Sequence, residues 1–129
     1  IAKLKFRADF VNLSACQTGL GKLYAGEGVV GLTHAFLTAG ANGLSVSLWN
    51  VADESTAMFM VGVYQLVEQR GMSYPQAINE MKRAFIRGQV SMDTFEPNRG
   101  ITVVSLDKAK PGKLSHPFYW APFVYYGKN

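Results

Sequence analysis

The stretch SACQTG at residues 14–19 contains Cys16, the single cysteine of this 129-residue chain. It directly follows FVNL at residues 10–13, a short apolar segment typical of a buried strand. A glycine-rich segment begins at Gly19 and extends to Gly28. A reactive side chain at the carboxyl end of a strand is fixed by the sheet and stays accessible in the loop, so Cys16 is a candidate nucleophile. The alternative is a buried cysteine that serves only as a small apolar residue.

The segments around this stretch predict two parallel strands joined by a helix. We predict a strand at residues 10–15, a loop at 17–27, a helix at 28–39 and a second strand at 43–49. We expect the first strand to be buried on both faces, because it is short and apolar. Parallel strands need a long crossover of this kind, which makes the segment a βαβ unit. Cys16 and residues 50–53 therefore fall at the carboxyl edge of the sheet, where open α/β sheets bind ligands.

The second half of the sequence predicts two further helices. Asp53 is typical of an N-cap for a helix over 54–70, and Gly71 ends that helix. Its expected buried stripe consists of Ala57, Met60, Val61, Tyr64 and Val67. Phe59, Val63 and Leu66 widen this stripe, so the helix is expected to be well buried. The pattern SYPQ at residues 73–76 is a capping box that opens a helix extending to about Arg87. The expected buried stripe of this second helix is Tyr74, Ala77, Ile78, Met81, Ala84 and Phe85.

Residues 88–115 carry weaker signals than the helices that precede them. A short strand over 101–106 is predicted, followed by an exposed turn rich in lysine around Pro111. The sequence FVYY at residues 123–126 predicts a last strand, and Pro122 allows it only a strand start or an edge position.

The composition excludes several classes of protein. With 48% hydrophobic and 17% charged residues, the chain is a folded globular domain rather than a disordered one. The net charge of +4 comes from scattered lysines and arginines, which favours a solvated basic surface over a nucleic-acid groove. No apolar run approaches the ~20 residues of a membrane span, so we expect no membrane partner and a cytoplasmic location. No cluster has metal-ligand spacing, so no metal or cofactor is expected.

A phosphate-binding loop is one alternative reading of GLGK at residues 19–22. That motif needs a glycine where Cys16 stands and a serine or threonine where Leu23 stands. The predicted loop to residue 27 also leaves no helix start directly behind it. A nucleotide-binding switch is therefore the weaker hypothesis.

A thiol nucleophile needs a base, normally a histidine. The chain contains His34, inside the first predicted helix, and His116, directly before Pro117. We expect His34 to be packed or partly exposed within its helix. We expect the segment that contains His116 to act as a conformational anchor. A papain-like order of cysteine then histidine would use His116, but the flanking signature of that family is absent.

Four blocks of the sequence, in the same order, resemble the CHAT family of caspase-like domains, which are often found behind TPR repeats. They lie at residues 9–19, 26–41, 47–57 and 116–123. The resemblance implies an α/β fold with a three-layer, caspase-hemoglobinase-like sheet and flanking helices. It also implies a Cys-His dyad that cleaves peptide bonds, with Cys16 as the nucleophile and no cofactor.

The family's histidine lies upstream of the matched blocks, and neither His34 nor His116 corresponds to it. Residues 1–129 are therefore expected to be the C-terminal part of one CHAT domain, truncated on its N-terminal side. The resemblance predicts a cysteine endopeptidase in the intact domain and an inactive fragment in isolation. It places Trp49, Asn50 and Asp53 beside the substrate cleft.

The expected partners follow from the same resemblance. They are a protein or peptide substrate, the upstream half of the domain and TPR repeats, with no nucleic acid. Self-association through an exposed sheet edge is also expected, since the strand over 10–15 would lack a neighbour. The rival hypothesis is a non-catalytic, caspase-like interaction or signalling domain.

Overall fold

The computed structural model describes residues 10–13, 25–49, 51, 53–96 and 100–127. They fall into two compact units, one drawn from Ile1–Asn50 and Pro122–Asn129 and the other from Val51–Ala121. The first unit contains β1 (Val11–Leu13), α1 (Ala25–Thr38), β2 (Gly43–Ser47) and β5 (Phe123–Gly127). The second contains α2 (Asp53–Arg70), α3 (Tyr74–Ile86), β3 (Phe95–Glu96), β4 (Gly100–Ile101) and α4 (Pro117–Trp120), with single 3-10 turns at Met92–Thr94 and Lys113–Ser115.

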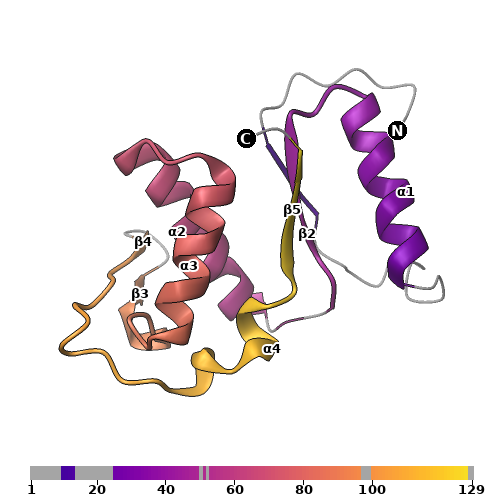
Figure 1. Ribbon diagram of the computed structural model, residues 1–129. Helices are drawn as coiled ribbons and strands as arrows, with labels where there is room; N and C mark the ends of the chain where they lie inside the picture. The colour runs from indigo at the N-terminus through magenta and orange to yellow at the C-terminus, as the bar shows by residue number, and fades with distance from the viewer. Residues whose placement is uncertain (1–9, 14–24, 50, 52, 97–99, 128–129) are drawn as a thin grey trace. The chain divides into compact units, whose positions relative to one another are not determined.

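The first unit is a three-stranded mixed sheet in the order β1-β2-β5. Strands β1 and β2 are parallel, with Leu13 opposite Val46, and β5 runs antiparallel to β2, with Val124 opposite Val46. Helix α1 lies along one face of this sheet (Figure 1). The predicted α/β fold and its βαβ unit are confirmed, and so is a last strand that begins directly after Pro122.

The core of the first unit lies between α1 and the sheet. Its members are Phe36, Ala41, Leu44 and Val46, with Val11, Leu13, Leu37, Val124 and Tyr126 packed against them. On the opposite face, Phe10 stacks on Tyr125 with ring centroids 6.5 Å apart. The expectation that the first strand is buried on both faces is wrong, because Asn12 is exposed between Val11 and Leu13. Successive side chains of a strand alternate between its faces, and the polar amide of Asn12 takes the face with water.

Helix α3 follows its sequence prediction closely. The Ser73 Oγ accepts a hydrogen bond from the Gln76 N–H at 3.4 Å, and the Ser73 N–H donates to Gln76 Oε1 at 3.1 Å, which completes the capping box. Ala77, Ile78, Met81, Ala84 and Phe85 are buried as predicted, whereas Tyr74 is only partly buried. Phe85 meets Phe59 of α2 edge to face, with centroids 5.4 Å apart, so α3 packs on α2 through this pair.

The buried face of α2 agrees with the prediction only in part. Phe59, Met60 and Val63 are buried as expected, whereas Ala57 is exposed and Tyr64 is 40% exposed. Ser55 and Met58 are buried as well, although the stripe did not include them. Apolar residues surround much of this helix, so periodicity alone does not fix the limits of its buried face. The helix ends as expected at Gly71, which adopts a φ of +65°.

Three element boundaries also differ from prediction. Helix α1 begins at Ala25 rather than residue 28, so residues 25–27 are helical and not loop. Strand β2 stops at Ser47, two residues early. The strand expected over 101–106 is reduced to Gly100–Ile101, because pairing with Phe95–Glu96 stops there, and Leu106 is exposed.

Candidate functional site

The predicted site residues are only partly covered by the structure. Cys16 and Asn50 lie outside the described residues. Trp49 is described, two positions after the end of β2. Helix α2 includes Asp53 as its first residue, whereas the sequence predicted a cap directly before a helix that starts at Glu54.

The described part of the predicted site is the carboxyl edge of the β1-β2 pair. Since the two strands are parallel, both of them end at this edge. The Ser47 Oγ donates a hydrogen bond to the Trp49 carbonyl at 2.7 Å, and the Leu48 N–H donates to the Pro122 carbonyl at 2.9 Å. These two bonds fix the chain as it turns away from the end of β2.

Two large apolar side chains are exposed at this edge. Leu48 is 38% exposed and Trp49 is 37% exposed. Burying such side chains against a ligand removes apolar surface from water, which stabilises a complex. The edge therefore offers an apolar contact surface beside the segment that carries Cys16 in the sequence.

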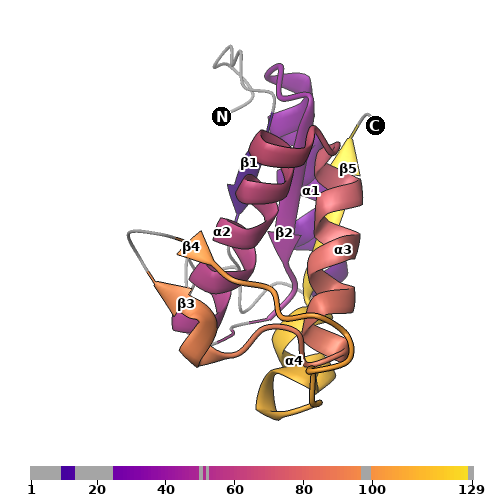
Figure 2. The ribbon, with the colours of Figure 1, turned by 90° about the vertical axis from the view of Figure 1, so that its left-hand side faces the viewer.

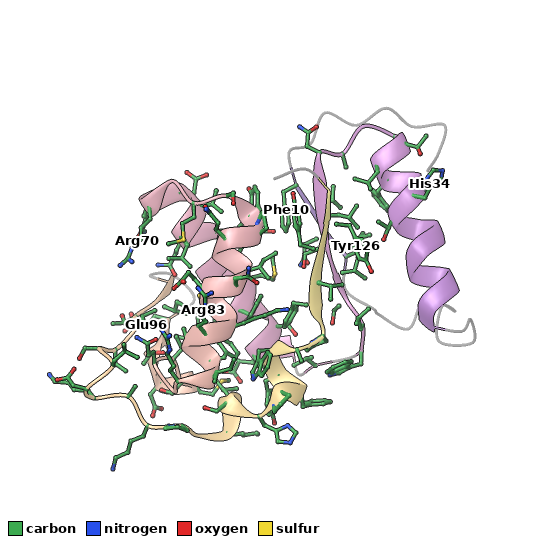
Figure 3. All side chains as sticks on the ribbon, viewed as in Figure 1. Phe10, His34, Arg70, Arg83, Glu96 and Tyr126 are labelled. Carbon is green, nitrogen blue, oxygen red and sulfur yellow. The ribbon has the colours of Figure 1, made fainter. Side chains whose placement is uncertain are left out.

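The structure describes both histidines, His34 in α1 and His116 directly before α4. His34 is exposed on α1 and points away from the sheet, near the end of the helix that leads into β2 (Figure 3). The carboxyl ends of β1 and β2 lie at the opposite end of the strands. His116 is the N-cap of α4, and its Nδ1 accepts a hydrogen bond from the Phe118 N–H at 3.1 Å. The anchoring role predicted for His116 is therefore confirmed.

A hollow in the second unit was not predicted from the sequence. It lies between α2, α3 and the chain that follows β4, which runs from α2 towards α3 in Figure 2. Its apolar lining includes Leu66, Met81 and Val103, and the arginines Arg70 and Arg87 also line it. An adjoining hollow shares Leu66, Arg70, Met81 and Val103 with it, and we call the two together the α2–α3 groove. Its residues are distant in the sequence and share no motif, so no local signal marks them.

The fold and the exposed edge define a class of α/β protein that presents its chemistry where parallel strands end. The model of the CHAT domain family matches residues 1–128, and the chain belongs to this family. The family is related to the caspase-like cysteine peptidases. The resemblance in the four sequence blocks is thus confirmed.

Two curated relatives are tetratricopeptide repeat protein 28 of mouse and of human. The chain is 30% identical to the mouse protein over 126 residues, 98% of the chain, and 30% identical to the human protein over 129 residues, its whole length. It spans about 4% of the length of each relative. No solved structure matches the chain. Among the described residues, no helix has the length and apolar composition needed to cross a bilayer.

Proposed function

We propose that this chain forms the C-terminal part of a CHAT cysteine endopeptidase domain in which Cys16 is the nucleophile. The observation that carries the proposal is the parallel pairing of β1 with β2, which sets the carboxyl ends of both strands at one edge. Cys16 follows Leu13, the last residue of β1, by three positions. Chain geometry therefore limits the separation of their Cα atoms to about 11 Å.

In the proposed reaction, the Cys16 thiolate attacks the carbonyl carbon of the scissile peptide bond. The tetrahedral intermediate collapses as the amine leaves with a proton, which gives an acyl-thioenzyme, and water then releases the carboxylic acid. The backbone N–H of Cys16 is a candidate donor to the oxyanion. The base is a histidine of the intact domain other than His34, which is exposed on the far side of α1, and His116, which caps α4.

The same edge supplies the proposed substrate contacts. Leu48 and Trp49 offer exposed apolar surface, and Asn50 and Asp53 follow them in the sequence. A carboxylate at position 53 favours a basic or amide-bearing substrate residue through a charge-assisted hydrogen bond. An Asp53→Ala variant of the active domain then changes cleavage preference. An unchanged preference would leave Asp53 only a role at the start of α2.

The decisive experiment is a peptidase assay of the intact domain, this chain together with the residues that precede it, on a peptide library. We expect cleavage that Cys16→Ala reduces at least about a thousandfold, the scale of losing a catalytic nucleophile. Circular dichroism establishes that the variant remains folded. Equal activity of Cys16→Ala and the parent would overturn the proposal. Cysteine-dependent cleavage by the 129-residue chain alone would show instead that it contains its own base.

A non-catalytic interaction domain is the second candidate function. The exposed Leu48 and Trp49 favour it, since they offer apolar surface to a partner. This hypothesis predicts partner binding that Trp49→Ala weakens and Cys16→Ala leaves unchanged, with no turnover by the intact domain.

A further inference from the structure

The α2–α3 groove combines an apolar lining with unneutralised positive charge. It consists of two adjoining hollows of about 280 and 290 Å³, which share Leu66, Arg70, Met81 and Val103. Ala84 and Val104 extend the apolar lining of the second hollow. Polar side chains line the two hollows as well, among them Gln65, Gln69 and Gln89, so the groove offers both apolar and polar contacts to a peptide.

The charges of the groove favour an anionic ligand. Arg70 and Arg87 both line the second hollow, and neither forms a salt bridge with another described residue. Figure 3 shows Arg70 projecting from the C-terminal part of α2. The one acidic residue that lines this hollow, Glu80, is paired with Arg83 at 2.6 Å. Two guanidinium groups thus remain available for carboxylates, which arginine binds in bidentate fashion.

The backbone along the groove indicates what kind of anion fits. The Thr102 N–H donates to the Thr94 carbonyl and the Val104 N–H donates to the Gln89 carbonyl, each at 2.9 Å. Val103, between them, forms no backbone hydrogen bond within the described part of the chain and is 47% exposed. Alternate residues of an extended chain direct their backbone groups to opposite sides. The N–H and C=O of Val103 are therefore open to pairing with an added strand.

We propose that the α2–α3 groove is a docking site for an extended acidic segment of a partner protein. The segment pairs with the backbone at Val103, places apolar side chains over Leu66 and Met81, and directs carboxylates to Arg70 and Arg87. This site is independent of the peptidase proposal, because its proposed contacts involve none of Cys16, Trp49, Asn50 and Asp53. A CHAT domain without peptidase activity would retain it.

The test is fluorescence anisotropy of the full chain with a labelled peptide of alternating glutamate and valine. Arg70→Gln and Arg87→Gln should each weaken binding roughly three- to tenfold, as expected for partly exposed charge-assisted hydrogen bonds. Lys108→Gln is the matched control, because it removes the same charge from an exposed turn outside the groove. Glu80→Gln should tighten binding, since it removes a negative charge that lines the hollow and repels the carboxylates of the ligand.

Two altered peptides separate this proposal from simpler explanations. Replacing each glutamate by glutamine, or N-methylating alternate backbone amides, should reduce binding at least about tenfold. Equal affinity for the glutamine peptide, or an equal loss in Lys108→Gln, would overturn the proposal in favour of unspecific attraction. Full competition by succinate would also overturn it, because the site would then recognise a small anion and not a peptide.

Discussion

Two glycines at helix ends have the same backbone conformation but different surroundings. Gly71 follows α2 with a φ of +65°, and Gly88 follows α3 with a φ of +71°. A Cβ at Gly71 would meet nothing within 4 Å, whereas a Cβ at Gly88 would meet the carbonyl of Lys110. Both positions thus require a residue that adopts a positive φ. Of the two, only Gly88 also lacks room for a Cβ.

We therefore expect Gly88→Ala to destabilise the protein more than Gly71→Ala does. The left-handed conformation costs a non-glycine residue about 1–2 kcal/mol, which applies to both variants. The backbone contact with Lys110 adds at least about 1 kcal/mol in Gly88→Ala. Urea unfolding of the two variants measures the difference directly, and equal losses would contradict this account.

Lys82 places a charged group in a half-buried position on α3. Burial lowers the pKa of Lys82 from its usual value of 10.5, so the charged form is disfavoured in the folded chain. Between the lowered pKa and 10.5, the folded protein binds fewer protons than the unfolded protein at this residue. The free energy of unfolding of the parent therefore rises with pH across that window.

Lys82→Met should consequently raise Tm at pH 7 by removing the half-buried charge. Its advantage over the parent should shrink as pH rises towards 10.5, because the lysine of the folded parent then becomes neutral. Tm measured for both proteins from neutral to alkaline pH tests this. Lys108→Met, at an exposed residue, is the control and should show no such trend. If the difference in Tm stays constant with pH, the higher Tm of Lys82→Met comes from packing alone.

At the scale of elements, the start of α3 depends on its capping box. Ser73→Ala removes the acceptor for the Gln76 N–H and leaves a helical donor without its partner. We expect a loss of about 1 kcal/mol in the free energy of unfolding. Ser105→Ala, in an exposed segment outside any helix, should change it by less than about 0.5 kcal/mol. Similar values for both serines would show that the cap contributes little.

Helix α3 could be predicted from the sequence because independent signals agree on it. The capping box marks its start, one clean apolar stripe marks its face, and Gly88 lies just beyond its end. For α2, the start and the end were close to correct, but the buried face was only partly so. Apolar residues on both sides of Phe59 left its exact limits to packing, such as that of Phe59 against Phe85.

The chain after α3 depends on contacts that are distant in sequence. The Ile101 N–H donates to Gln65 Oε1 at 2.9 Å, and Gln89 Nε2 donates to the Val104 carbonyl at 3.0 Å. Such hydrogen bonds between the backbone and glutamine side chains take the place of strand pairing, and they leave no pattern in neighbouring residues. The carboxyl edge of the sheet, by contrast, was predictable, because a βαβ unit requires parallel strands.

At the scale of the whole molecule, the described sheet has β1 at one edge and β5 at the other. An unpaired edge is a template for another strand. We expect the chain to self-associate in solution as its concentration increases, which sedimentation equilibrium measures as a rising average mass.

Asn12→Lys should reduce this association, because it adds a charge to an exposed position of β1. Thr38→Lys adds the same charge at the end of α1 and should leave the association unchanged. A monomer at every concentration would rule out an available edge.

The antiparallel pairing of β2 with β5 sets an order of events during synthesis. Ser47 pairs with Phe123, and the entire second unit is encoded between them. A ribosome therefore releases the second unit as one continuous stretch before the last strand of the first unit exists. Closing so long a loop costs little more entropy than closing one of half its length, and a folded insert brings its ends into a defined geometry. The sheet can therefore gain its third strand only after every residue of the inserted unit has been synthesised.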